Sequence, residues 1–186
     1  MSKPQRQSVP KPLDRNSVLA AAFELLREQG LAALSMRKLA ERLSVRAPAL
    51  YWHFADKGEL LGLMAGAIYR DAREAVGPCG DGRAWLVEYG KALRSRLTRE
   101  PDAAQLCAIA PPAREGAPAS ADAIAAPLTQ RGFDRGAALT AIASVTSLAL
   151  GWSTFEANGP MHHFLEGMID FDRSFEAGLD ALVKGL

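Results

Sequence analysis

Apolar residues recur three and four positions apart along nearly the whole chain, and no segment alternates between apolar and polar residues as a half-buried strand does. Segment 14–29 shows the helical pattern clearly, with a one-sided apolar stripe, and Gly30 follows where a helix commonly ends. The chain has 186 residues, enough to bury a core without disulfides or metals. We therefore expect an all-α fold.

The charges divide the chain into a basic end and an acidic remainder. Residues 1–57 carry a net charge of +5 and the rest −4, although the whole chain is at only +1. Such asymmetry is typical of a protein whose one end meets a polyanion. Residues 1–12 lack the apolar run of a secretory signal, and we expect them to form a flexible basic arm.

Two further features bear on the compartment. Cys79 and Cys107 could form at most one disulfide, which a chain of this size does not need, so we expect reduced thiols in a cytoplasmic protein. Residues 136–155 carry no charge and are long enough to span a bilayer. They contain several Ser, Thr, Ala and Gly residues and lack basic or aromatic residues at both ends, so we interpret them as a buried helix and expect no membrane partner.

Residues 35–54 indicate two short helices joined by a tight turn. Ser35 is a good N-cap for a helix over 36–43, a turn follows at 44–45, and a very short helix runs from Ala47 to about Phe54. Pro48 lies in the first turn of that helix, where its missing N–H does no harm. This is the helix-turn-helix arrangement, in which the second helix lies in the major groove of DNA.

The remaining helices are expected over longer segments. Asp56 and Glu59 have the spacing of a capping box that opens a helix over 57–76, and the Gly-rich cluster 77–82 ends it. Segment 111–119 is expected to be a mobile loop, and 162–167 one helical turn. Further helices are expected over 84–99, 102–110, 120–130, 134–155 and 170–184.

The segment Leu34–Leu60, LSMRKLAERLSVRAPALYWHFADKGEL, resembles the DNA-binding signature of the TetR family of bacterial transcriptional repressors, above all in LYWH at 50–53. The likeness continues in the preceding LDRNSVLAAAFELLREQGLAALS and is weaker in RGF at 131–133 and in the final FEAGLDALVKGL. The resemblance implies three parts: the arm over 1–12, a three-helix helix-turn-helix domain over 13–58, and a helical body for ligand binding and dimerisation over 59–186.

By position, the resemblance also implies which residues touch double-stranded operator DNA. Arg37 would fork onto a guanine edge, Tyr51 and His53 would reach phosphates, and Trp52 would pack between helix and backbone. Lys57 and the start of the next helix would hold a further phosphate. Taken singly, Trp52 could instead be core, Tyr51 a surface aromatic and His53 a hydrogen-bonded histidine. The full set is Ser35, Arg37, Arg46, Ala47, Pro48, Ala49, Tyr51, Trp52, His53 and Lys57.

Two departures from the family pattern stand out. Ala47 and Ala49 occupy positions where a family member presents polar base readers, so more of the reading is expected from Arg37, Arg46 and DNA shape. Ser44 stands where the family usually has Gly, at a cost of about 1 kcal/mol if its φ must be positive. The two alanines leave open an alternative, a dimeric ligand-binding module without DNA binding.

The body offers candidates for a dimer interface. The helix over 134–155 is apolar nearly all round, and the last helix repeats apolar residues beside small ones. Two such helices from each chain would pair as a four-helix bundle, as the resemblance implies, unless both are used within the monomer core. The candidate interface residues are Leu139, Ile142, Val145, Leu148, Phe175, Leu179 and Leu182.

The middle helices carry apolar and aromatic residues that suit a small hydrophobic effector, although the same residues also suit an ordinary core. They are Trp85, Tyr89, Leu93, Leu106, Ile109, Trp152 and Phe155. We expect no cofactor or metal: Cys107 and Phe155 stand about where a drug-binding family member has a magnesium-binding histidine and a pocket glutamate. His162, His163 and Glu166 could share a helical face as metal ligands, but no zinc motif supports them, and a solvated polar patch is the plainer interpretation.

An enzyme using His53 or His162 with a carboxylate is a further alternative. No nucleophile elbow, phosphate loop or spaced acid pair supports it, so we expect no enzyme. The sequence therefore predicts a cytoplasmic, homodimeric repressor that a small-molecule effector releases from a palindromic operator.

Overall fold

The computed structural model describes residues 13–114, 117–118, 120–157 and 159–186, so the arm expected over 1–12 lies outside the described residues. The described part is almost entirely helical, which confirms the all-α prediction. Its elements are α1 Arg15–Gln29, the 3₁₀ turn η1 Leu31–Ala33, α2 Met36–Arg42, α3 Ala47–Leu50, α4 Lys57–Glu74, α5 Gly82–Leu97, α6 Ala103–Ile109, β1 Ala113–Arg114, β2 Ala117–Pro118, α7 Ala121–Thr129, α8 Arg135–Glu156, α9 Pro160–Leu165 and α10 Phe171–Lys184.

Most helices begin at an Asp or Ser side chain that accepts a hydrogen bond from a backbone N–H of the first turn. Ser35 accepts from Lys38 N at 3.2 Å and Asp56 from Glu59 N at 2.8 Å, as predicted. The capping box expected at α4 has a different second half, because Glu59 accepts from Ala55 N at 2.7 Å. The same kind of cap opens α1, α5, α7, α8 and α10, at Asp14, Asp81, Ser120, Asp134 and Asp170.

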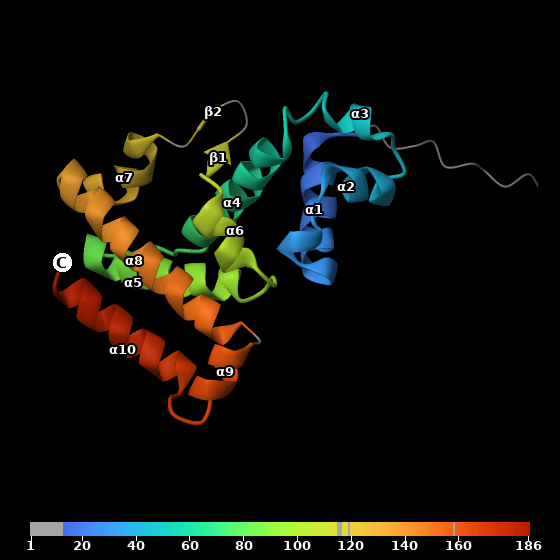
Figure 1. Cartoon of the computed structure of the whole chain (residues 1–186). Coiled ribbons are helices and arrows are strands. Elements are labelled where there is room, and N and C mark those ends of the chain that lie inside the picture. Colours follow the sequence, from blue (N-terminus) through green and yellow to red (C-terminus); the bar gives the residue numbers. More distant parts are fainter. Residues whose placement is uncertain (1–12, 115–116, 119, 158) are drawn as a thin grey trace, which may run out of the picture.

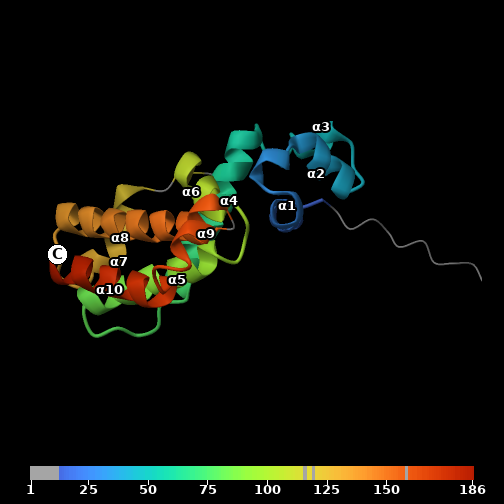
Figure 2. The same cartoon turned by 60° about the horizontal axis from the view of Figure 1, so that its bottom comes forward.

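Helices α1–α3 gather at one end of the molecule, and α4 runs from them into the body formed by α5–α10 (Figure 1). Because α4 is unbroken from Lys57, the boundary expected between residues 58 and 59 falls inside a helix shared by both regions. In the body, α5 packs against α4, α8 and α10, and α8 and α10 lie side by side (Figure 2). A Cβ on Gly90 would lie within 3.0 Å of Leu179 and Val145 atoms, so glycine allows this close approach.

The segment expected to be a loop, 111–119, contains a two-residue antiparallel pair, in which Ala113 pairs with Pro118 and Arg114 with Ala117. Strand β1 packs directly on α4 at Gly66. Only glycine allows this approach, since a Cβ on Gly66 would lie 2.0 Å from the Ala113 carbonyl oxygen. The sequence did not reveal this contact because its two sides are 47 residues apart.

Helix α8 is, among the described residues, the one helix long and apolar enough to cross a membrane. Here it packs on α5, α7 and α10. Its buried face, which includes Ala138, Ala141, Val145 and Ala149, forms part of the core of the body. The opposite face is exposed at Thr140, Ala143, Ser147 and Gly151, so this helix is part of the core but is not buried on all sides as expected.

Candidate DNA interface and ligand cleft

The helix-turn-helix forms from the residues that the sequence indicated. Leu39 and Ala40 of α2 and Leu50 of α3 are buried where the two helices cross, with Leu43 and Val45 packed beside them. Ser44 has a φ of 55°, so the turn does place a non-glycine residue in the left-handed region. The cost expected for Ser44 therefore applies.

Arg15 of α1 holds the turn that follows α3. Its Nε donates a hydrogen bond to the His53 carbonyl oxygen at 2.8 Å, and its Nη2 pairs with Glu59 at 2.5 Å. The guanidinium also lies 5.2 Å from the centre of the Phe54 ring. These contacts join α1, the segment after α3 and the start of α4. Sequence reasoning missed them, because partners 38 and 44 residues apart leave no local signal.

The predicted DNA-contacting residues lie at the surface. Trp52 is 89% exposed and Tyr51 53%, so neither is a core residue, whereas Phe54 is buried. Large aromatic side chains exposed to this extent are available to a partner. Of the predicted set, Arg37, Arg46, Pro48, Tyr51, Trp52 and Lys57 are exposed, and Ser35, Ala47, Ala49 and His53 are partly exposed.

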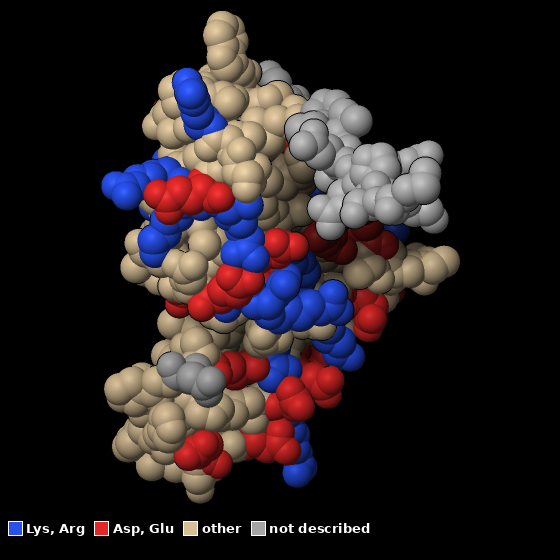
Figure 3. Space-filling view, turned by 90° about the vertical axis from the view of Figure 1, so that its right-hand side faces the viewer, with Lys and Arg blue, Asp and Glu red and all other residues tan. Residues whose placement is uncertain are grey.

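Basic side chains at this end of the molecule are interleaved with acidic ones (Figure 3). Arg42 binds both carboxylate oxygens of Glu28 at 2.6 Å, and this hydrogen bonding lowers the pKa of Glu28 and raises that of Arg42. Arg37 pairs with Glu41 at 2.9 Å. Arg46 and Lys57, on either side of α3, form no ion pair with any residue that the structure describes. No carboxylate among the described residues neutralises their charge, so their contact with phosphates stays a prediction.

A second contact joins this end to the body at the connection between α5 and α6. Both Arg27 Nε and Nη2 donate to the Glu100 carboxylate at 3.1 Å, which raises the pKa of Arg27. Asp102 accepts from Leu31 N at 2.8 Å while its own φ is 59°. The DNA-binding end is therefore tied to the body both by α4 and by this junction.

A cleft of about 870 Å³ opens between α1, α4, β1 and α7. Its lining is mostly apolar, with two arginines and a glutamate on α4. The residues around it are Asn16, Leu19, Leu63, Gly66, Tyr69, Arg70, Arg73, Glu74, Pro112, Ala113, Ala123, Ile124, Ala126, Pro127 and Gln130. Sequence reasoning did not find this site, because four separate segments build it.

The seven residues predicted to line a ligand pocket lie elsewhere. Trp85 and Tyr89 stack on each other in the core, with ring centres 5.0 Å apart, and Leu93 and Leu106 are fully buried. Trp152 is half-buried, and the side chains of Ile109 and Phe155 are 60% and 40% exposed. None of the seven lines the cleft on α4, so their role in ligand binding stays a prediction.

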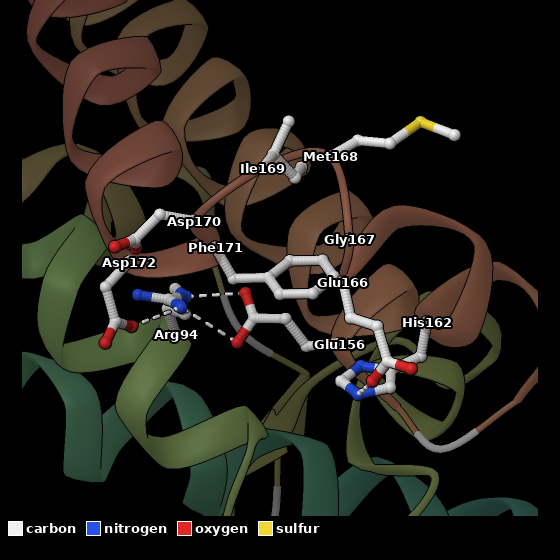
Figure 4. Close-up of a pocket in the computed structure, with 10 residues that line it drawn as sticks. All are labelled: Arg94, Glu156, His162, Glu166, Gly167, Met168, Ile169, Asp170, Phe171 and Asp172. Carbon is white, nitrogen blue, oxygen red and sulfur yellow. Dashed lines mark hydrogen bonds and ion pairs between the residues drawn. The ribbon is translucent and has the colours of Figure 1, made fainter.

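A second hollow, at the ends of α5, α8 and α9, is polar (Figure 4). Arg94 points to Glu156 and Asp172 and bonds them at 2.6 and 2.7 Å. His162 Nε2 lies 3.3 Å from Glu166, and the His162 ring stacks on Phe171. His163 Nδ1 is 2.7 Å from the Gly159 carbonyl oxygen. Among the described residues, no three His, Cys, Asp or Glu side chains are grouped to hold a metal ion.

The predicted dimer residues divide into two sets. Ile142, Val145, Phe175 and Leu179 are buried in the core of the protomer itself, where α8 and α10 pack on α5. They therefore do not lie on the protomer surface. Leu139, Leu148 and Leu182 are partly exposed and remain candidates.

The short helix α3 packs on α2 through the buried Leu50 and is flanked by the exposed Arg46 and Tyr51, which is the helix-turn-helix arrangement typical of regulators of transcription. Residues 18–64 match the family model of bacterial regulatory proteins, tetR family. The chain is 34% identical to the class A tetracycline repressor protein from transposon 1721 of Escherichia coli, in an alignment that covers 94% of this chain and 90% of the repressor. The chain belongs to the TetR family.

Further relatives and solved structures support the same family assignment. An HTH-type transcriptional regulator of Saccharopolyspora erythraea is 36% identical over 80% of this chain, which spans 64% of that relative's length. The crystal structure of a TetR variant from Acinetobacter baumannii in complex with minocycline has a TM-score of 0.73 and 32% identity, covering 93% of this chain and 96% of that one. BioQ with its double-stranded DNA operator has a TM-score of 0.69 and 31% identity, covering 93% and 97%.

Proposed function

We propose that this TetR-family regulator is a homodimeric, cytoplasmic repressor that presents two α3 helices to two operator half-sites and is released by a small molecule. The observation that carries the proposal is the surface around α3, where Arg46, Tyr51, Trp52 and Lys57 are exposed. Arg46 and Lys57 can neutralise phosphates, and the aromatic pair can pack against the DNA backbone. The structural likeness to BioQ, solved with its operator, supports this placement.

The outward faces of α8 and α10 support the dimer. Away from the core, α8 exposes Thr140, Ala143, Ser147 and Gly151, and α10 exposes Ala177 and Ala181. Side chains this small let helices of two protomers approach closely, with Leu148 and Leu182 at the edges for apolar contact. One reading helix covers too few base pairs for specific binding, so a twofold pair is required.

The proposal predicts salt-sensitive binding to DNA from upstream of the protein's own coding sequence. In a fluorescence anisotropy titration at moderate salt, the wild type should bind with nanomolar affinity, which should fall steeply as salt rises. Arg46→Ala should weaken binding by about 5- to 150-fold, corresponding to about 1–3 kcal/mol. Arg83→Ala, which changes an exposed arginine on α5, is the matched control and should leave binding unchanged.

Sedimentation of the same samples separates the alternatives. A dimer that binds no tested fragment in a salt-sensitive way would favour the ligand-binding module without DNA binding. A monomer at micromolar concentration would overturn the dimer. Equal losses of DNA affinity for Arg46→Ala and Arg83→Ala would mean that the surface around α3 does not contact DNA.

A further inference from the structure

The cleft between α1, α4, β1 and α7 has the size and lining of a small-molecule site. Its volume of about 870 Å³ lies within the range of about 300–1,000 Å³ common for such sites. Leu19 of α1, Leu63 of α4 and Ile124 of α7 provide apolar walls, and Pro127 lies at one side. An apolar molecular body would bury its surface against these side chains.

The charged side chains in the cleft favour an apolar ligand that also carries a negative charge. Arg73 is partly buried in the wall and forms no ion pair with any carboxylate that the structure describes. The neighbouring phenol of Tyr89 offers it no negative charge, because burial raises the pKa of Tyr89. Arg70, one turn away, forms two loose ion pairs, at 3.7 Å with Asp71 and at 3.9 Å with Glu74. A partly buried cation without a counterion is costly, and an anionic ligand would offset that cost.

The neutral groups around Arg73 fit the same ligand. Tyr69 lines the cleft, and burial raises the pKa of its phenol, so it stays an uncharged donor. Its hydroxyl makes only a long contact, 3.4 Å, with the Cys107 carbonyl oxygen. Asn16 and Gln130 add polar groups at the rim without adding charge.

We propose that this cleft binds an amphipathic organic anion, whose acidic group pairs with Arg73 and Arg70 and whose apolar body lies against Leu19, Leu63 and Ile124. The inference rests on the proposed function, for which it names the chemical class of the effector and its site. It differs from the pocket predicted on the middle helices, since none of those seven residues lines this cleft.

The position of the cleft also explains how binding would reach DNA. Asn16 and Leu19 belong to α1 of the DNA-binding end, while α7 belongs to the body. Ala113, also in the lining, rests directly on Gly66 of α4. A ligand that fits one separation of α1 and α7 better than another shifts the position of α3, because only a difference in affinity moves such an equilibrium.

The test uses a matched pair of fluorescent probes and the full chain without DNA. One probe is 8-anilinonaphthalene-1-sulfonate, and the other is N-phenyl-1-naphthylamine, which has the same rings but no sulfonate. Arg73→Gln should weaken binding of the sulfonate about tenfold and leave the neutral probe unchanged, because only the ion pair is lost. Arg83→Gln is the control, and neither probe should respond to it.

Two more variants locate the binding. Ala123→Trp fills the cleft and should abolish binding of both probes. The exposed apolar side chains on and after α9, Met161, Phe164 and Met168, are a competing dye site, so Phe164→Ser should leave both affinities unchanged. Equal effects of Arg73→Gln and Arg83→Gln on the sulfonate, or sulfonate binding that survives Ala123→Trp, would overturn the proposal. Because no DNA is present, this result is independent of the operator titration, and either can fail alone.

Discussion

The DNA-binding end and the body of this protein are held together in different ways. Helices α2 and α3 have only seven and four residues, too short to be stable alone. Ser35 caps α2, and Arg15 fixes the turn after α3 through its hydrogen bond to the His53 carbonyl oxygen and its ion pair with Glu59. Helix α8 of the body has 22 residues and packs through small and apolar side chains. The difference teaches that the end with the strongest local sequence signals still needs distant partners to position its reading helix.

The largest expected effect tests whether α3 is anchored by burial. Leu50, the last residue of α3, is fully buried where α3 packs on α2, so Leu50→Ala should lower the free energy of unfolding by about 2–5 kcal/mol. Leu139→Ala, at a partly exposed site on α8, should cost clearly less and serves as the control. Urea denaturation followed by circular dichroism measures both. Equal losses would mean that α3 is no better anchored than the outer edge of the body.

The junction between the two regions should show the next largest effect. Asp102→Ala removes the acceptor for Leu31 N and leaves alanine at a φ of 59°, so stability should fall by about 1–3 kcal/mol. Asp102→Asn keeps an acceptor oxygen and tolerates this backbone conformation, and it should lose less than half as much. Thermal unfolding of the two variants measures both losses of stability. Identical losses would mean that the hydrogen bond from Leu31 N does not stabilise the junction.

The turn of the helix-turn-helix should respond in the opposite direction. Ser44 has a φ of 55°, and Ser44→Gly should stabilise the chain by about 0.5–1 kcal/mol through relief of that strain. Ser95→Gly, at an exposed position inside α5, should instead destabilise by a similar amount. The sign of the change in urea midpoint is the readout, and a loss at both sites would contradict the strained turn.

The smallest effect is a chemical one in the body. Burial raises the pKa of Cys107 to about 12, so almost none of its reactive thiolate is present at pH 8, whereas the residue Cys79 is partly exposed. An aromatic disulfide reagent should therefore modify one thiol per native chain and two after denaturation in urea. The variant Cys79→Ala should show no rapid reaction, and rapid modification of Cys107 would mean that the core around α6 opens readily.

Much of the fold could be predicted because its signals are local. Caps at Ser35 and Asp56, the apolar stripe of α1 and the Gly cluster after α4 placed helix ends within a few residues. The same reasoning raised the possibility of a positive φ at Ser44, which the structure confirms. The resemblance of LYWH and its surroundings to a known signature then located the DNA-binding end.

What could not be predicted depends on contacts between distant segments. Local periodicity marked Val145 and Leu179 as apolar but could not say whether they face another chain or α5, and in fact they are buried against their own protomer. The cleft needed α1, α4 and α7 to be brought together, and the charge on Arg73 stands out only when its surroundings are known. Arg15 shows the same limit at the DNA-binding end.

Hydroxyl-radical footprinting of the wild-type protein on duplexes selected from a random-sequence pool tests most directly whether two α3 helices read DNA as a twofold pair. We predict two protected patches on one face of the duplex, with centres about 10–10.5 base pairs or a multiple apart and with related, inverted sequences. A pool that yields no enriched sequence, or a single protected patch without a symmetric partner, would contradict the account.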